Sequence, residues 1–233
     1  MALQYQIIPV TAFLQNSTVL WCDATKHAAV VDPGGDIERL QSFIQSHALQ
    51  VQHILLTHGH VDHAGAAEAL ALYYHVSIAG PHEADHFLLS MLSEQARLFH
   101  FPDPVPEKIT LPIGWLTHQA HIVLGDEILE VLHCPGHTPG HIVFYNQQAC
   151  LVVVGDVLFK NSIGRTDLPG GDGRVLRQSI RRQLFTLPDA TRVIPGHGSM
   201  TTIGDEKHHN PHFVPNDNEN MASLTGIEPV IAP

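Results

Sequence analysis

Short apolar runs separated by turn residues fill the first half of the chain, and their length is typical of β-strands. Helical patterns follow several of these runs, and one begins after the turn Asp32-Pro33-Gly34-Gly35. The apolar runs predict strands over residues 5–10, 17–22, 27–32, 51–57 and 76–79. The helical patterns predict helices over residues 36–47, 64–74 and 82–100.

The second half of the chain repeats this order after a proline-rich segment, 101–115, which we expect to be a loop. Gly125-Asp126 is a hairpin signal between two further apolar runs. Strands are predicted over 122–124, 128–133, 141–145, 150–154 and 191–194, and an amphipathic helix over 174–187.

Two sets of strands, each finishing with helices, predict an α/β fold in which two sheets pack face to face with helices outside. This architecture is a four-layer αβ/βα sandwich. We expect residues 1–213 to form it as one domain. Residues 214–233 lack periodicity and are predicted to be a flexible C-terminal tail.

Composition narrows the classes of function. Hydrophobic residues make up 44% of the 233 residues and charged residues 15%, as in globular proteins. No apolar run reaches the roughly 18–20 residues of a membrane span, and the N-terminus has no secretory pattern, so we expect a cytoplasmic protein without a membrane partner. The formal charge of −11 argues against nucleic acid as a partner. The three cysteines are interpreted as buried thiols rather than a disulfide framework.

The strongest chemical signal lies directly after the apolar run 51–57. His58, His60, Asp62 and His63 stand within six residues there, around Gly59. A glycine-containing loop at a strand end can turn several side chains toward one point. Histidine and carboxylate are common metal ligands, so the segment predicts a metal site rather than a polar loop.

Three further apolar runs end at a potential ligand beside a glycine. His137 follows Cys134-Pro135-Gly136, Asp156 follows Gly155, and His197 lies between Gly196 and Gly198. Any one of these would be weak, because such residues are common in turns. Four strand ends of the same form in one chain predict a shared site.

The string HGHVDH, residues 58–63, matches the HxHxDH motif of the metallo-β-lactamase superfamily, and His137, Asp156 and His197 follow in the order of that family. The chain resembles this family over about residues 5–213, which implies the sandwich fold with metals at one edge. The resemblance implies a first metal on His58, His60 and His137, a second on Asp62, His63 and His197, and Asp156 as the bridge. Asp62 and Asp156 would also be the catalytic carboxylates.

Five imidazoles and two carboxylates without a thiolate suit zinc first, with iron or manganese as alternatives. We therefore expect two divalent metal ions per chain. Two ions about 3.5–4 Å apart would share a water and lower its pKa toward neutrality.

Within the family, the chain resembles compact glyoxalase II-like proteins, which are similar to hydroxyacylglutathione hydrolases. The supporting strings are Asp32-Pro33-Gly34-Gly35, HCPGHTPGH (133–141), GDVLF (155–159) and IPGHG (194–198). The implied reaction is hydrolysis of S-D-lactoylglutathione, a small-molecule thioester and glutathione conjugate. Family β-lactamases generally lack the bridging aspartate, so Asp156 disfavours a β-lactam substrate.

Lys160 and Arg165 are candidate contacts to the substrate carboxylates, because both follow Asp156 closely. The alternative for each is a solvent-facing or structural ion pair. His141 could orient a metal ligand or pack beneath the site. Cys134 is interpreted as a small buried residue.

A competing resemblance rests on Gly164-Arg165-Thr166-Asp167. This string is similar to one in persulfide dioxygenases, a sister branch that holds one iron on two histidines and an aspartate. Ile163 stands where that branch has a cysteine. A mono-iron glutathione persulfide dioxygenase is therefore the alternative function. A binding protein with a degenerate site is not supported, because no ligand position is missing.

Overall fold

The first of two six-stranded sheets is formed by the N-terminal half. The computed structural model describes residues 2–214, so most of the predicted tail lies outside the described residues. The strand order is β1-β2-β3-β4-β5-β6, antiparallel from β1 to β3 and parallel from β3 to β6. The strands are β1 (Leu3–Val10), β2 (Gln15–Cys22), β3 (His27–Val31), β4 (Gln50–Leu55), β5 (Ser77–Ala79) and β6 (Ile113–Gly114).

The second six-stranded sheet has the order β14-β13-β10-β9-β8-β7, in which only the β10–β13 pair is parallel. Its strands are β7 (His121–Leu124), β8 (Glu127–His133), β9 (Ile142–Asn146), β10 (Leu151–Gly155), β13 (Arg192–Pro195) and β14 (Thr201–Thr202). A small hairpin of β11 (Leu158–Phe159) and β12 (Ser162–Ile163) lies beside it.

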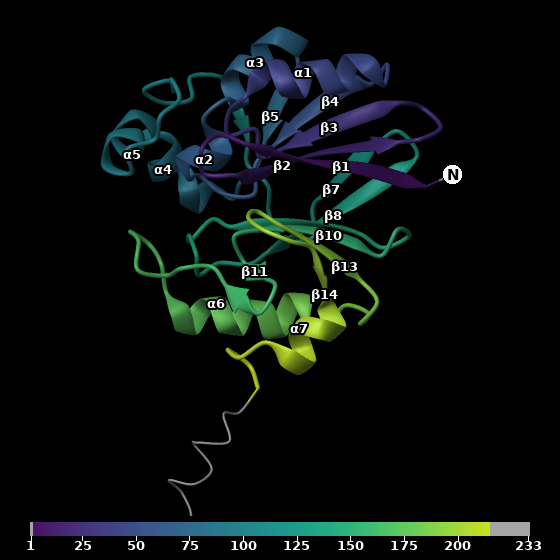
Figure 1. Ribbon diagram of the computed structural model, residues 1–233, viewed down its shortest axis with the longest axis vertical. Coiled ribbons are helices and arrows are strands. Elements are labelled where there is room, and N and C mark those ends of the chain that lie inside the picture. Colours follow the sequence, from purple (N-terminus) through teal and green to yellow (C-terminus); the bar gives the residue numbers. More distant parts are fainter. Residues whose placement is uncertain (1, 215–233) are drawn as a thin grey trace, which may run out of the picture.

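Helices cover the outer face of each sheet, which gives four layers (Figure 1). On the first sheet lie α1 (Ile37–Ser46) and α3 (Ala67–Tyr74), with α2 (Val61–Ala64), η1 (Glu83–Asp85), α4 (His86–Leu89) and α5 (Leu92–Leu98) at one side. On the second lie α6 (Gly173–Ser179), its continuation η2 (Ile180–Leu184) and α7 (Ile203–His209). The predicted sandwich is confirmed.

Three buried apolar clusters hold these layers together. One lies between the first sheet and its helices and includes Leu40, Ile54 and Leu70. One lies between the two sheets and includes Leu55 and Phe144, and a third packs the second sheet against α6 and α7. Burial of such side chains contributes roughly 1.5–3 kcal/mol each. The strands are thereby fixed as a rigid base for the loops at their ends.

Two predicted helices are interrupted. Residues 82–100 form η1, α4 and α5 rather than one helix, with a break at Ser90 and Met91. The break places the Gln95 amide where it donates to Leu88 O and Gly59 O and accepts from Val61 N, so tertiary hydrogen bonds outweigh helical continuity. The helix predicted over 174–187 is not α-helical throughout, because a π-helical turn, η2, interrupts it from Ile180 to Leu184.

No helix among residues 2–214 is long and apolar enough to span a membrane.

Candidate metal centre

The predicted ligands converge at one edge of the sandwich, from strand ends of both sheets. The loop after β4 carries His58 and His60, and the short helix α2 that follows presents Asp62 and His63. The second sheet contributes the other three, which come after β8, β10 and β13: His137, Asp156 and His197.

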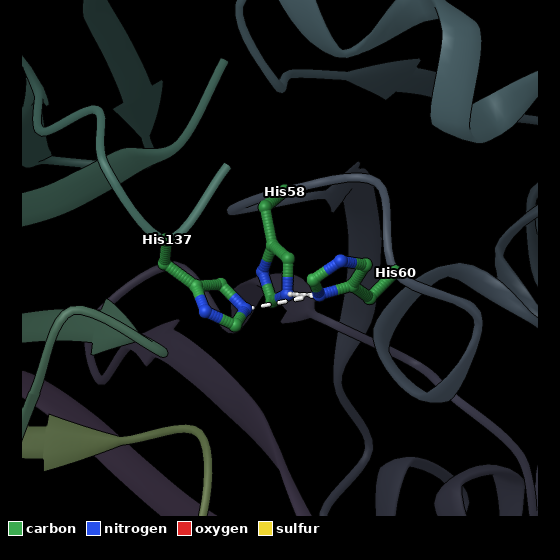
Figure 2. Close-up of side chains that lie close together, drawn as sticks. All are labelled: His58, His60 and His137. Carbon is green, nitrogen blue, oxygen red and sulfur yellow. Dashed lines mark hydrogen bonds between the residues drawn. The ribbon is translucent and has the colours of Figure 1, made fainter. Parts of the chain in front are cut away.

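Three imidazoles meet in the first group, as Figure 2 shows. Nδ1 of His60 lies 3.1 Å from Nε2 of His58 and 2.9 Å from Nε2 of His137. Three nitrogens around zinc at about 2.0–2.1 Å would stand roughly 3.3 Å apart in tetrahedral geometry. The observed spacing therefore matches a set of ligands around one ion.

Hydrogen bonds on the far side of two rings show which nitrogens are free. Nδ1 of His137 faces the carbonyl oxygen of Arg165 at 2.7 Å and must donate to it. Nδ1 of His58 lies 3.0 Å from Thr57 Oγ1, whose own hydrogen goes to Asp32. The Nε2 atoms of His58 and His137 therefore both direct a lone pair at Nδ1 of His60, which can donate at most one hydrogen. At least one pair of nitrogen lone pairs is left facing each other, and a cation bound between the three rings would remove this repulsion.

The second group consists of Asp62, His63 and His197. Nε2 of His197 lies 3.1 Å from Asp62 Oδ2, and Nε2 of His63 lies 3.6 Å from the same oxygen. Asp156 stands between the groups, with one oxygen 3.7 Å from His137 Nε2 and 3.8 Å from His197 Nε2. Its other oxygen lies 3.4 Å from His63 Nε2. This is the placement that a bridging ligand requires.

Two buried atoms test whether these residues fit metal ions. Nε2 of His63 and Oδ1 of Asp156 are buried without a hydrogen-bond partner among the residues described. A buried polar atom without a hydrogen-bond partner destabilises the fold unless a bound ion or water interacts with it. The two atoms lie 3.4 Å from each other, one on a candidate ligand of the second group and the other on the candidate bridge, so the donor set fits divalent cations.

Asp32, for which the sequence predicts only a turn, lies beside the candidate ligands. Its side chain accepts from Thr57 N and Thr57 Oγ1, each at 2.7 Å, and faces His63 Nδ1 at 3.0 Å. It is 2% exposed. Partners of this kind fix the tautomer and the orientation of a metal-bound histidine. The position of Asp32 at the end of a strand was the available signal.

His141 does both things that the sequence left open. Its ring stacks on His58, with centroids 4.6 Å apart and an interplanar angle of 16°. Its Nε2 accepts the backbone N–H of Asp156 at 3.1 Å. His141 therefore packs under the first group and also orients Asp156, the candidate bridge. Cys134, as predicted, is fully buried.

Burial and charge set the protonation states at the centre. Burial, and then the neighbouring His137, lowers the pKa of His60 to about 3. Burial likewise holds the pKa of His58 well below its ordinary value. Burial opposes ionisation of Asp156, but His63 and the other histidines outweigh it and lower the pKa of this carboxyl. Burial also lowers the pKa of His137, so the three-histidine group is neutral at pH 7, the form in which histidine binds a metal. His63 differs, because Asp62 and Asp156 outweigh its burial and raise its pKa well above the ordinary value.

A model of the metallo-beta-lactamase superfamily matches residues 10–197. The chain belongs to this superfamily. Hydroxyacylglutathione hydrolase GloC of Haemophilus influenzae is 47% identical over 207 residues, which make up 88% of this chain and 96% of that protein. The predicted family and enzyme class, a metal-dependent hydrolase, are thereby confirmed.

Two solved structures of the superfamily share the fold closely. BLEG-1, a B3 metallo-beta-lactamase, is 36% identical with a TM-score of 0.83, over 91% of this chain and all (100%) of that one. TTHA1623 in a di-iron-bound form is 35% identical with a TM-score of 0.80, over 88% of this chain and 98% of that one.

In this chain, a cavity of about 430 Å³ opens over the candidate metal centre. Its floor is formed by metal-ligand candidates and its walls are largely apolar. The wall residues are Phe13, Phe99, Phe159, Ser162, Ile163, Arg165 and Leu168.

The two basic residues predicted to contact substrate differ in placement. Arg165 lines the cavity, but its guanidinium is held by Asp167 through bonds of 2.8 and 2.7 Å. Lys160 is exposed and does not line the cavity, although its neighbour Phe159 does. The structure thus brings the seven ligand candidates together and one of the two basic residues beside them.

Proposed function

We propose that the chain is a binuclear thioester hydrolase that converts S-D-lactoylglutathione to D-lactate and glutathione, a step of methylglyoxal detoxification in the cytoplasm. The observation that carries this proposal is the position of Asp156 between two complete ligand groups. The similarity to a hydroxyacylglutathione hydrolase supports the substrate. Zinc is the first expectation for the metal, and the di-iron form of TTHA1623 supports iron as an alternative.

Two bound divalent ions would polarise the thioester carbonyl and lower the pKa of a shared water toward neutrality. The residues of the chain prepare this chemistry. His58, His60 and His137 would hold the first ion, and Asp62, His63 and His197 the second. Asp156 offsets the repulsion between the two charges.

The cavity walls contribute orientation and exclusion of water. Phe159 lies over His197, with ring centroids 6.4 Å apart, and Leu168 lines the cavity as well. Removing bulk water strengthens the electrostatic interactions of the carbonyl oxygen with its site. Arg165, on the wall, is the proposed contact for a glutathione carboxylate, and Lys160 is proposed to act at the rim.

The alternative, a mono-iron glutathione persulfide dioxygenase, needs only one metal. A one-metal oxygenase and a two-metal hydrolase can share all seven ligand-type residues, including the group of Asp62, His63 and His197, so the number and identity of the bound metals separate the two functions. The expectation against β-lactam substrates rests on Asp156 alone and stays a prediction, which hydrolysis assays with β-lactams would test, because BLEG-1 is a B3 metallo-beta-lactamase.

One experiment separates these functions. Purified protein is stripped of metal, reloaded with Zn(II), Mn(II) or Fe(II), and assayed for thioester loss from S-D-lactoylglutathione. We expect rapid, metal-dependent hydrolysis with two metals per chain. Oxygen consumption with glutathione persulfide, together with no thioester hydrolysis by protein shown to bind metal, would replace the proposal with the dioxygenase.

A further inference from the structure

Asp85 is a buried carboxylate that the reaction does not use directly. It lies in the turn η1 and is fully buried. Its Oδ2 accepts from Gly59 N at 2.9 Å and from Thr138 Oγ1 at 2.8 Å, and its Oδ1 accepts from Gly140 N at 2.5 Å. No cation pairs with it among the described residues. Its negative charge is therefore stabilised by three neutral donors.

These donors belong to the two loops that carry the first metal group. Gly59 stands between His58 and His60, in the loop after a strand of the first sheet. Thr138 directly follows His137, in a loop of the second sheet. The distances among the three imidazoles depend on how far apart these loops are held. One carboxylate bonded to both loops sets that separation.

The surrounding backbone leaves little room for adjustment. A Cβ on Gly140 would lie 2.6 Å from His82 O and from Asp85 N, and a Cβ on Gly59 would lie 2.7 Å from Leu88 Cβ. His82 N also donates to Gly140 O at 3.0 Å. Both loops therefore pack in close contact with the segment 82–88, which contains Asp85.

We propose that Asp85 is a positioning residue for the three-histidine metal group. It fixes His58 and His60 against His137 across the junction of the two sheets. The proposal rests on the metal assignment of the proposed function, but not on its substrate. A carboxylate is required, because all three partners donate; an amide would set its own N–H against at least one of them. Burial raises the pKa of Asp85 to about 6, so the group is ionised at the pH 7.5 chosen for the test.

The test compares Asp85→Asn with Glu68→Gln. Glu68 is also buried and also accepts from two backbone N–H groups and one threonine hydroxyl, those of Thr110 and Leu111, but it serves no ligand loop. Zn(II) affinity is measured by chelator competition, and the Co(II)-loaded proteins are compared by visible absorption. Thermal unfolding shows how much each change destabilises the fold.

We expect Asp85→Asn to weaken the tighter Zn(II) site about 10- to 100-fold, as loss of a partner behind metal ligands commonly does. Its Co(II) spectrum should change, whereas Glu68→Gln should keep the parental affinity and spectrum. Equal metal affinity and an unchanged spectrum in both variants would overturn the proposal, whatever the stability.

A second pair of variants decides the matter if Asp85→Asn does not fold. Thr138→Val removes one donor to Asp85, and Thr110→Val removes the matching donor to Glu68. We expect a smaller loss of Zn(II) affinity, several-fold, and a shifted Co(II) spectrum only in Thr138→Val. If the two valine variants have the same Zn(II) affinity and the same Co(II) spectrum, the hydrogen bond from Thr138 to Asp85 stabilises the fold without positioning the metal group. None of these readouts depends on turnover, so they remain valid if the thioester substrate is wrong.

Discussion

Oδ2 of Asp32 lies 3.0 Å from Nδ1 of His63, and both side chains are buried. The same oxygen accepts the hydroxyl of Thr57, which in turn lies 3.0 Å from His58 Nδ1. One carboxylate therefore orients a candidate ligand in each of the two groups. The arrangement joins the centre to the end of β3, a strand that contributes no ligand itself.

Replacement of Asp32 should weaken metal binding through the histidines that it contacts, whether or not it binds an ion with His58 and His63, a group that could hold one. We expect Asp32→Ala to lower metal affinity about 10- to 100-fold, because His63 and His58 lose the partner that holds their rings. Asp36→Ala is the control, since the side chain of Asp36 accepts from Thr11 N, away from the centre. Metal titration of both variants checks this prediction, and parental affinity in Asp32→Ala would contradict it.

Asp156 is predicted to be needed by both metal ions. Asp156→Ala removes the side chain that lies near His63, His137 and His197, so the repulsion between two dications would be unrelieved. We expect metal content to fall from two per chain to one or less, and hydrolysis to fall at least about 100-fold. Metal analysis after dialysis gives the stoichiometry. Two tightly held metals with full turnover would show that Asp156 is not the bridge.

The convergence of the seven candidate ligands could be predicted from sequence because each follows an apolar strand, and four of them lie within six residues of the loop after β4 and helix α2. Their role as ligands stays a prediction. Asp32 and Asp85 could not be predicted, because their roles depend on contacts across the fold. An aspartate before Pro-Gly is normally a turn residue, and Asp85 lies in a stretch with an ordinary helical pattern. The break of that helix at Ser90 has the same cause, since Gln95 bonds to distant backbone groups.

The cysteines should differ sharply in reactivity. Burial raises the pKa of Cys134 far above its ordinary value, and Cys22 is 1% exposed, whereas Cys150 is partly exposed. Thiolate is the reactive form, and reagent must also reach it. We expect a disulfide reagent at pH 8 to label about one thiol per native chain and all three after unfolding. Cys150→Ser should abolish the native reaction; rapid labelling that persists in this variant would contradict the burial of the other two.

Release of Arg165 from Asp167 should improve binding of a substrate that carries carboxylates. The pair is exposed, and such pairs contribute about 0.2–1 kcal/mol, so Asp167→Asn should lower KM for S-D-lactoylglutathione by up to about five-fold with little change in kcat. Asp189→Asn is the control, because it frees Lys207 from another exposed pair, which lies outside the cavity. Arg165→Ala should have the opposite effect and raise KM. Lys160→Ala should raise KM less, because Lys160 does not line the cavity. Initial-rate kinetics of the four variants check these expectations. An unchanged KM in both Arg165→Ala and Lys160→Ala would mean that the glutathione carboxylates are bound elsewhere, and that Arg165 serves only through its backbone carbonyl, which orients His137.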